Sequence, residues 1–88
     1  MAKIVLIDDH ALLRNGLAGL IKSLGHQVVY EADNGKHFIE QLKASGQVPD
    51  MVLLDINMPV MDGYDTALWI RSNMQSIKVL ALSMNDNE

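Results

Sequence analysis

Residues 51–59 read Met51-Val52-Leu53-Leu54-Asp55-Ile56-Asn57-Met58-Pro59, and this stretch decides the fold of the chain. The apolar run before Asp55 is typical of a parallel strand that is covered on both faces. In open α/β sheets, ligands bind outside the carboxyl ends of such strands. Asp55 is therefore predicted to lie at one edge of a sheet, beside a position where a ligand can bind.

A second stretch near the start of the chain has the same arrangement. Residues 3–7 form an apolar strand, and Asp8 and Asp9 follow it directly. Leucine and isoleucine residues at three- and four-residue spacing predict a helix over residues 11–24, with Gly25 at its carboxyl end. The remaining pattern predicts strands at 28–32, 51–54 and 77–82, and helices at 36–44 and 63–73.

The predicted order of elements is βαβαβαβ, which indicates an α/β fold with a parallel sheet and right-handed crossovers. The short strands and helices favour a flavodoxin-like, doubly wound sheet with strand order 2-1-3-4. In that order the first and third strands are neighbours. Asp8 and Asp9 are then expected to lie beside Asp55, although they are far apart in the sequence.

Three carboxylates at one sheet edge repel one another, so a bound cation would stabilise them. Oxygen ligands without cysteine favour a hard cation such as Mg²⁺ or Mn²⁺. A carboxylate beside Mg²⁺ can also act as a nucleophile toward a phosphoryl group. The alternative is that Asp8 and Asp9 cap the first helix and Asp55 begins a turn. We expect His10 to shape the rim of the site rather than to bind metal.

The composition sets further limits on the class of protein. The chain has 88 residues, of which 49% are apolar, so we expect one domain over residues 1–88. The net charge is −4 and no basic stripe is visible, so this segment is not expected to bind nucleic acid or an anionic membrane. No signal peptide or membrane span is apparent, and the absence of cysteine is compatible with the cytoplasm.

Three stretches together carry a resemblance to a known family: residues 4–10, residues 55–63 and residues 79–83. Asp55 is followed four residues later by Pro59 and eight residues later by Gly63, and Ser83 ends the fourth strand. This pattern resembles the receiver domain of bacterial two-component response regulators, over essentially the whole chain. Residues 9–17 are similar to the subfamily whose members carry a C-terminal helix-turn-helix domain that binds DNA, which implies transcription control.

The resemblance implies a role for each matching residue. Asp55 is the expected phosphoacceptor, which takes a phosphoryl group from a sensor histidine kinase. Asp9, Asp55 and the backbone carbonyl of Asn57 are the expected Mg²⁺ ligands, with Asp8 assisting. Ser83 is the expected hydroxyl that contacts the phosphoryl group. The chain is then a signalling module and not an enzyme.

Whole receivers of the family contain five βα units, and the fifth has no counterpart here. We therefore expect a truncated receiver domain that lacks the family's phosphoryl-contacting lysine. The fourth strand then forms an exposed edge, which predicts a homodimer or higher oligomer. An inert receiver fragment remains an alternative. A Mg²⁺-dependent aspartyl-phosphate phosphohydrolase is another, although such enzymes typically carry a second Asp where this chain has Asn57.

Overall fold

The computed structural model describes residues 1–55 and 61–82. The alternation of strands and helices predicted from the sequence is confirmed, with boundaries that differ by at most one residue. The elements in chain order are β1 (Lys3–Ile7), α1 (Ala11–Ser23), β2 (Gln27–Ala32), α2 (Gly35–Ser45), β3 (Met51–Asp55), α3 (Gly63–Asn73) and β4 (Lys78–Leu82).

The strands form one parallel sheet in the order β2-β1-β3-β4, as predicted. Strand β1 lies between β2 and β3, and Ile7 at its end is in register with Ala32 on one side and Leu54 on the other. Asp55 is the last residue of β3 and is paired with Leu82 of β4. The carboxyl ends of the strands therefore meet at one edge of the sheet.

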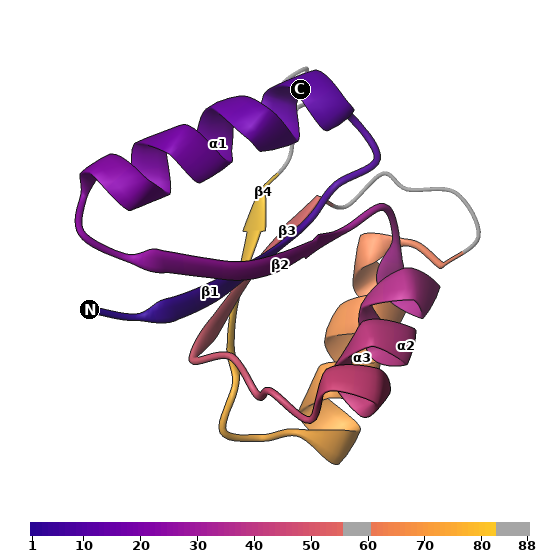
Figure 1. The fold of residues 1–88 in the computed structure, drawn as a ribbon. Coiled ribbons are helices and arrows are strands. Elements are labelled where there is room, and N and C mark those ends of the chain that lie inside the picture. The colour runs from indigo at the N-terminus through magenta and orange to yellow at the C-terminus, as the bar shows by residue number, and fades with distance from the viewer. Residues whose placement is uncertain (56–60, 83–88) are drawn as a thin grey trace.

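Helix α1 covers one face of the sheet, and helices α2 and α3 lie together on the other face (Figure 1). The alternation of side chains along β1 divides the core between these faces. Ile4 and Leu6 pack with Ala18 and Ile21 of α1. On the opposite face, Val5 and Ile7 pack with residues of both other helices, among them Phe38, Leu42 and Ile70.

Polar side chains and glycines fix the ends of the helices. The side chain of Asn34 accepts a hydrogen bond from the backbone N–H of His37 at the start of α2, and Asp62 does the same for Asp65 at the start of α3. Such caps satisfy backbone donors that have no partner within the helix. Gly25 and Gly46 follow α1 and α2 with φ angles of 88° and 69°, which other residues rarely adopt.

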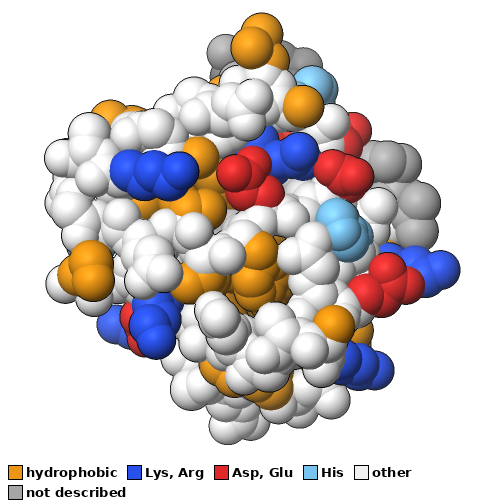
Figure 2. Space-filling view, in the orientation of Figure 1, with side chains coloured by type: hydrophobic (Ala, Val, Ile, Leu, Met, Phe, Trp, Pro, Cys, Tyr) orange, Lys and Arg blue, Asp and Glu red, His pale blue; other side chains and the backbone are white. Residues whose placement is uncertain are grey.

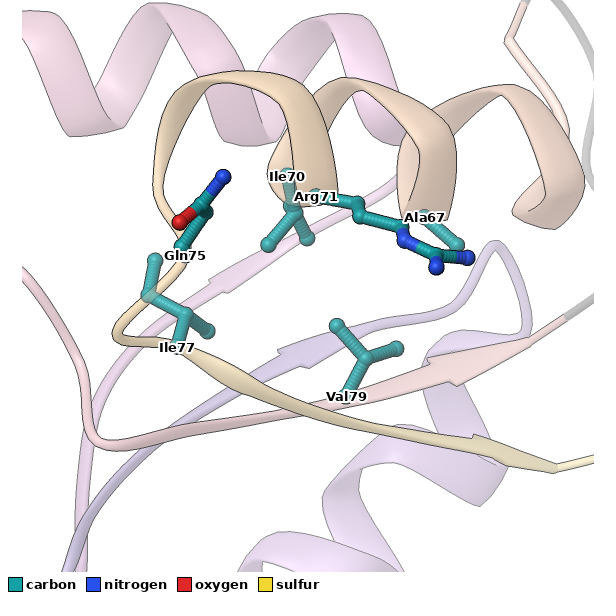
Figure 3. Close-up of a pocket in the computed structure, with 6 residues that line it drawn as sticks. All are labelled: Ala67, Ile70, Arg71, Gln75, Ile77 and Val79. Atoms are coloured by element: carbon teal, nitrogen blue, oxygen red, sulfur yellow. The ribbon is translucent and has the colours of Figure 1, made fainter.

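Strand β4 is one of the two outer strands of the sheet within the described residues, and β3 is its neighbour. Leu80 is 50% exposed and Val79 is 36% exposed. Between α3 and β4 lies a groove of about 430 Å³ (Figure 3), lined by Ala67, Ile70, Arg71, Gln75, Ile77 and Val79. Because Val79 is near the start of β4, this groove lies away from the carboxyl ends of the strands.

None of the helices in the described parts of the chain is both long enough and apolar enough to cross a membrane.

Candidate metal centre

Two neighbouring strands bring the predicted acidic residues together. Asp8 follows the last residue of β1, and Asp55 ends β3, which pairs with β1. Ligand atoms of Asp8, Asp9, His10 and Asp55 all lie within 4.8 Å of one another. The three carboxylates lie together as predicted from the sequence, and His10 lies with them.

These residues differ in their exposure to solvent. Asp8 is 5% exposed and Asp55 is 4% exposed, so their carboxylates form the inner part of the site. Asp9 and His10 are exposed and form its outer rim. A cation at this position would be held from the protein side by buried carboxylates and would remain accessible from solvent.

His10 contacts every carboxylate of the site. Its Nδ1 atom lies 3.2 Å from Asp8 Oδ1, 3.2 Å from Asp9 Oδ1 and 3.8 Å from Asp55 Oδ2. The hydrogen bond with Asp8 and the negative charge of Asp9 raise the pKa of His10 above its ordinary value of 6.5. The imidazolium form of His10 therefore offsets part of the negative charge of the cluster when no metal is bound.

The alternative that Asp8 and Asp9 cap α1 is wrong. The residue at the N-cap position is His10, and its side chain forms no capping hydrogen bond. Asp8 Oδ1 instead accepts a hydrogen bond from the backbone N–H of His10 at 2.8 Å, just before the helix begins. This short turn orients the residues of the cluster relative to one another.

Arg14 of α1 holds the loop of Asp8, Asp9 and His10 through a hydrogen bond to its backbone. Its Nη1 atom donates to the backbone carbonyl of Asp8 at 2.6 Å and to Asp33 Oδ1 at 2.8 Å, and its Nε atom donates to Glu31 Oε1 at 2.9 Å. Acidic and basic side chains gather between α1 and the start of α2 in Figure 2. The network connects the end of β1 to the end of β2, and the sequence pattern gave no signal for it.

Two residues predicted for this site, Asn57 and Ser83, lie outside the described residues. The Asn57 carbonyl as a metal ligand and the Ser83 hydroxyl as a phosphoryl contact therefore remain predictions.

The donor set fits a hard divalent cation. The buried carboxylates of Asp8 and Asp55 lie beside the exposed carboxylate of Asp9. A divalent cation would offset the repulsion among these three negative charges. Mg²⁺ typically binds to one or two carboxylates and keeps several waters, and the exposed rim formed by Asp9 and His10 leaves room for such waters.

A parallel sheet of order 2-1-3-4, with carboxylates at the ends of its two central strands, defines a receiver-type α/β module. The family model described as "Response regulator receiver domain" matches residues 4–88. The chain belongs to this family, as the sequence motifs predicted.

Several relatives agree with this assignment. The chain is 41% identical over 88 residues to the nitrate/nitrite response regulator protein NarL of Escherichia coli K12, covering 99% of this chain and 40% of that protein. It is 37% identical over 84 residues to the chemotaxis protein CheY of Listeria monocytogenes, covering 94% of this chain and 68% of the relative. The chain thus spans about two fifths of NarL but two thirds of CheY.

Solved structures share the fold. The signal receiver domain of the NarL protein from Mycobacterium tuberculosis matches with a TM-score of 0.86 and 39% identity, over 98% of this chain and 68% of that one. The response regulator TrrA from Thermotoga maritima, solved in complex with Mg²⁺ and BeF, matches with a TM-score of 0.86 and 28% identity, over 98% and 72% of the two chains.

Proposed function

We propose that this chain is the phosphoacceptor module of a two-component response regulator, with Asp55 as the acceptor. The observation that carries the proposal is the position of the Asp55 carboxylate at the end of β3, together with Asp8 and Asp9. In the proposed step a carboxylate oxygen of Asp55 attacks the phosphorus of a phosphohistidine. The P–N bond breaks, the imidazole leaves, and an acyl phosphate forms on Asp55.

We propose Mg²⁺ as the cofactor, held by Asp8, Asp9, Asp55 and the carbonyl of Asn57. When bound, Mg²⁺ supplies positive charge that stabilises the oxygens of the transferring phosphoryl group. Asp8 and Asp9 hold the cation, and Asp55 shares it while providing the nucleophile. The similar receiver TrrA was solved with Mg²⁺ and a fluoroberyllate group, which supports the same ligand chemistry here.

Receiver domains are typically signalling modules, and we propose that this chain also acts through its phosphorylated state rather than by turnover. Ser83 is the proposed hydroxyl that binds the phosphoryl group. The identity to NarL proteins supports transcription control in a longer regulator, with DNA bound by a separate output domain. We propose that residues 1–88 are the part of a receiver domain that carries its acidic site.

The proposed partners are a sensor histidine kinase and a second copy of this chain. Kinase phosphohistidine is made from ATP, so we propose a cytoplasmic location. Exposed Val79 and Leu80 on β4, an outer strand of the described sheet, support association through this edge.

Intact-mass measurement after incubation with acetyl phosphate tests the proposed function. With Mg²⁺, the wild type is expected to gain the mass of one phosphoryl group, and with EDTA it is expected to gain none. Asp55→Asn removes the nucleophile and is expected to stay unmodified. Asp65→Asn is the matched control, because Asp65 is an exposed aspartate on α3. This variant is expected to behave like the wild type.

Two other outcomes would contradict the proposal. An unmodified wild type in the presence of Mg²⁺ would favour the inert fragment. Release of many equivalents of phosphate per chain, lost in Asp55→Asn, would favour the phosphohydrolase.

A further inference from the structure

The imidazole of His10 directs its Nδ1 atom toward the same space as the carboxylates. Nδ1 is 3.2 Å from one oxygen of Asp8 and 3.2 Å from one oxygen of Asp9. Neighbouring ligands of an octahedral ion with bonds of about 2.1 Å are separated by about 3.0 Å. Nδ1 and the two oxygens are therefore spaced almost like adjacent ligands of a single ion.

The position of the His10 ring is set by the short loop between β1 and α1, whose backbone is held by several hydrogen bonds. The backbone N–H of His10 donates to Asp8 Oδ1 at 2.8 Å, and the carbonyl of His10 accepts the first hydrogen bond of α1, from the N–H of Arg14 at 2.9 Å. Arg14 also holds the carbonyl of Asp8. The ring attached at this point lies at the exposed rim of the site, beside the carboxylates that would hold a cation.

We propose that His10 is a direct ligand for divalent cations that favour imidazole, such as Co²⁺, Ni²⁺ and Zn²⁺, at this site. The inference rests on the proposed metal site and departs from our expectation that His10 only shapes its rim. Imidazole suits these metals, whereas Mg²⁺ selects oxygen ligands and water. A site of three carboxylates and one imidazole therefore discriminates among cations in a way that three carboxylates alone do not.

The test is calorimetric titration of the chain with CoCl₂ and, separately, MgCl₂, at about pH 8 where a larger fraction of imidazole is neutral. His10→Asn removes the proposed nitrogen ligand and retains the backbone N–H that Asp8 accepts. We expect this variant to bind Co²⁺ at least about tenfold more weakly. Its affinity for Mg²⁺ should stay the same or rise.

His37→Asn is the matched control for non-specific imidazole binding. His37 is a half-buried histidine on α2 whose Nδ1 accepts from the backbone N–H of Asp33. This variant should bind both metals like the wild type. The proposal is overturned if His10→Asn binds Co²⁺ as tightly as the wild type, or if its affinities for the two metals fall together.

A second variant and a second measurement separate this inference from the proposed function. Asp9→Asn should weaken the binding of both metals. A wild type that binds Co²⁺ but does not bind Mg²⁺ would contradict only the proposal that Mg²⁺ is the cofactor. In ¹⁵N-labelled protein, Zn²⁺ should shift the Nδ1 resonance of His10 more than the Nε2 resonance. An unshifted Nδ1 resonance at saturating Zn²⁺ would overturn the role of His10 as a ligand. Circular dichroism verifies that each variant is folded.

Discussion

Arg14 Nη1 donates a 2.6 Å hydrogen bond to the backbone carbonyl of Asp8, so α1 holds the end of β1 that carries the acidic site. The Arg14 side chain is only 16% exposed, and it also contacts Glu31 and Asp33 near the end of β2. Because Asp33 is 64% exposed, that ion pair is expected to contribute little. The stabilising part of the network is the buried contact with the loop.

We predict that Arg14→Met lowers the free energy of unfolding by about 1.5–3 kcal/mol, because the carbonyl of Asp8 loses a charged donor. Urea denaturation measures this change. Arg71→Met is the control, since Arg71 is exposed on α3, and it should change stability by no more than about 0.5 kcal/mol. Equal effects of the two substitutions would contradict a supporting role for Arg14.

Gly35 lies at a close approach between the start of α2 and the start of α3. A Cβ atom at this position would collide with Thr66 Oγ1, and Thr66 is fully buried. We predict that Gly35→Ala costs about 1–3 kcal/mol of stability, as overpacking typically does.

Gly19→Ala is the control for this glycine, because among the described residues a Cβ there meets nothing within 4 Å beyond its own helix backbone and chain neighbours. Within α1 the alanine should stabilise the protein by about 0.5–1 kcal/mol, through its better helix propensity. Thermal unfolding of both variants measures these opposite shifts. A neutral or stabilising Gly35→Ala would contradict the close packing of α2 on α3.

The raised pKa of His10 predicts a pH-dependent stability in the metal-free protein. Hydrogen bonding to Asp8, with the charge of Asp9, favours the protonated imidazole in the folded state. The resulting stability is complete below the ordinary pKa of 6.5 and is lost as the pH rises through the higher pKa of the folded protein. In EDTA, the stability advantage of the wild type over His10→Asn should therefore shrink from about pH 6 to about pH 9. A difference that stays constant or grows over this range would contradict the contacts of His10.

The exposed outer strand predicts self-association. Leu80→Lys places a charge on the exposed edge of β4 and is expected to shift the chain toward monomer at micromolar concentration. Leu68→Lys is the control, because Leu68 is 63% exposed on α3, away from the strand edge. Light scattering gives the masses, and a monomeric wild type would contradict association through β4.

The sequence predicted the sheet and the approach of the carboxylates because both follow from local patterns. Apolar runs of strand length fix β1 and β3, and the carboxyl ends of adjacent parallel strands meet at one edge. Asp8, Asp9 and Asp55 could therefore be placed together without knowledge of any side-chain conformation. The winding order 2-1-3-4 was predicted from the alternation of short strands and helices, which favours a flavodoxin-like sheet.

Other parts of the site depend on tertiary contacts that periodicity does not encode. His10 was expected only to shape the rim, because a site rich in carboxylates favours Mg²⁺. The contact of the His10 backbone N–H with Asp8 Oδ1 could not be predicted from the sequence. Arg14 contacts residues 17 and 19 positions later in the chain, so only the packing of α1 beside β2 brings them together. Gly35 likewise faces Thr66 only because α2 and α3 share one face of the sheet.

The most direct test of the central claim is to locate the phosphoryl group. Sodium borohydride reduces an aspartyl phosphate to homoserine, and trypsin then separates peptide 4–14, with Asp8 and Asp9, from peptide 44–71, with Asp55. After incubation with acetyl phosphate and Mg²⁺, we predict homoserine at position 55 and unmodified aspartate at positions 8 and 9. Homoserine in peptide 4–14, or in neither peptide, would contradict the assignment of Asp55 as the phosphoacceptor.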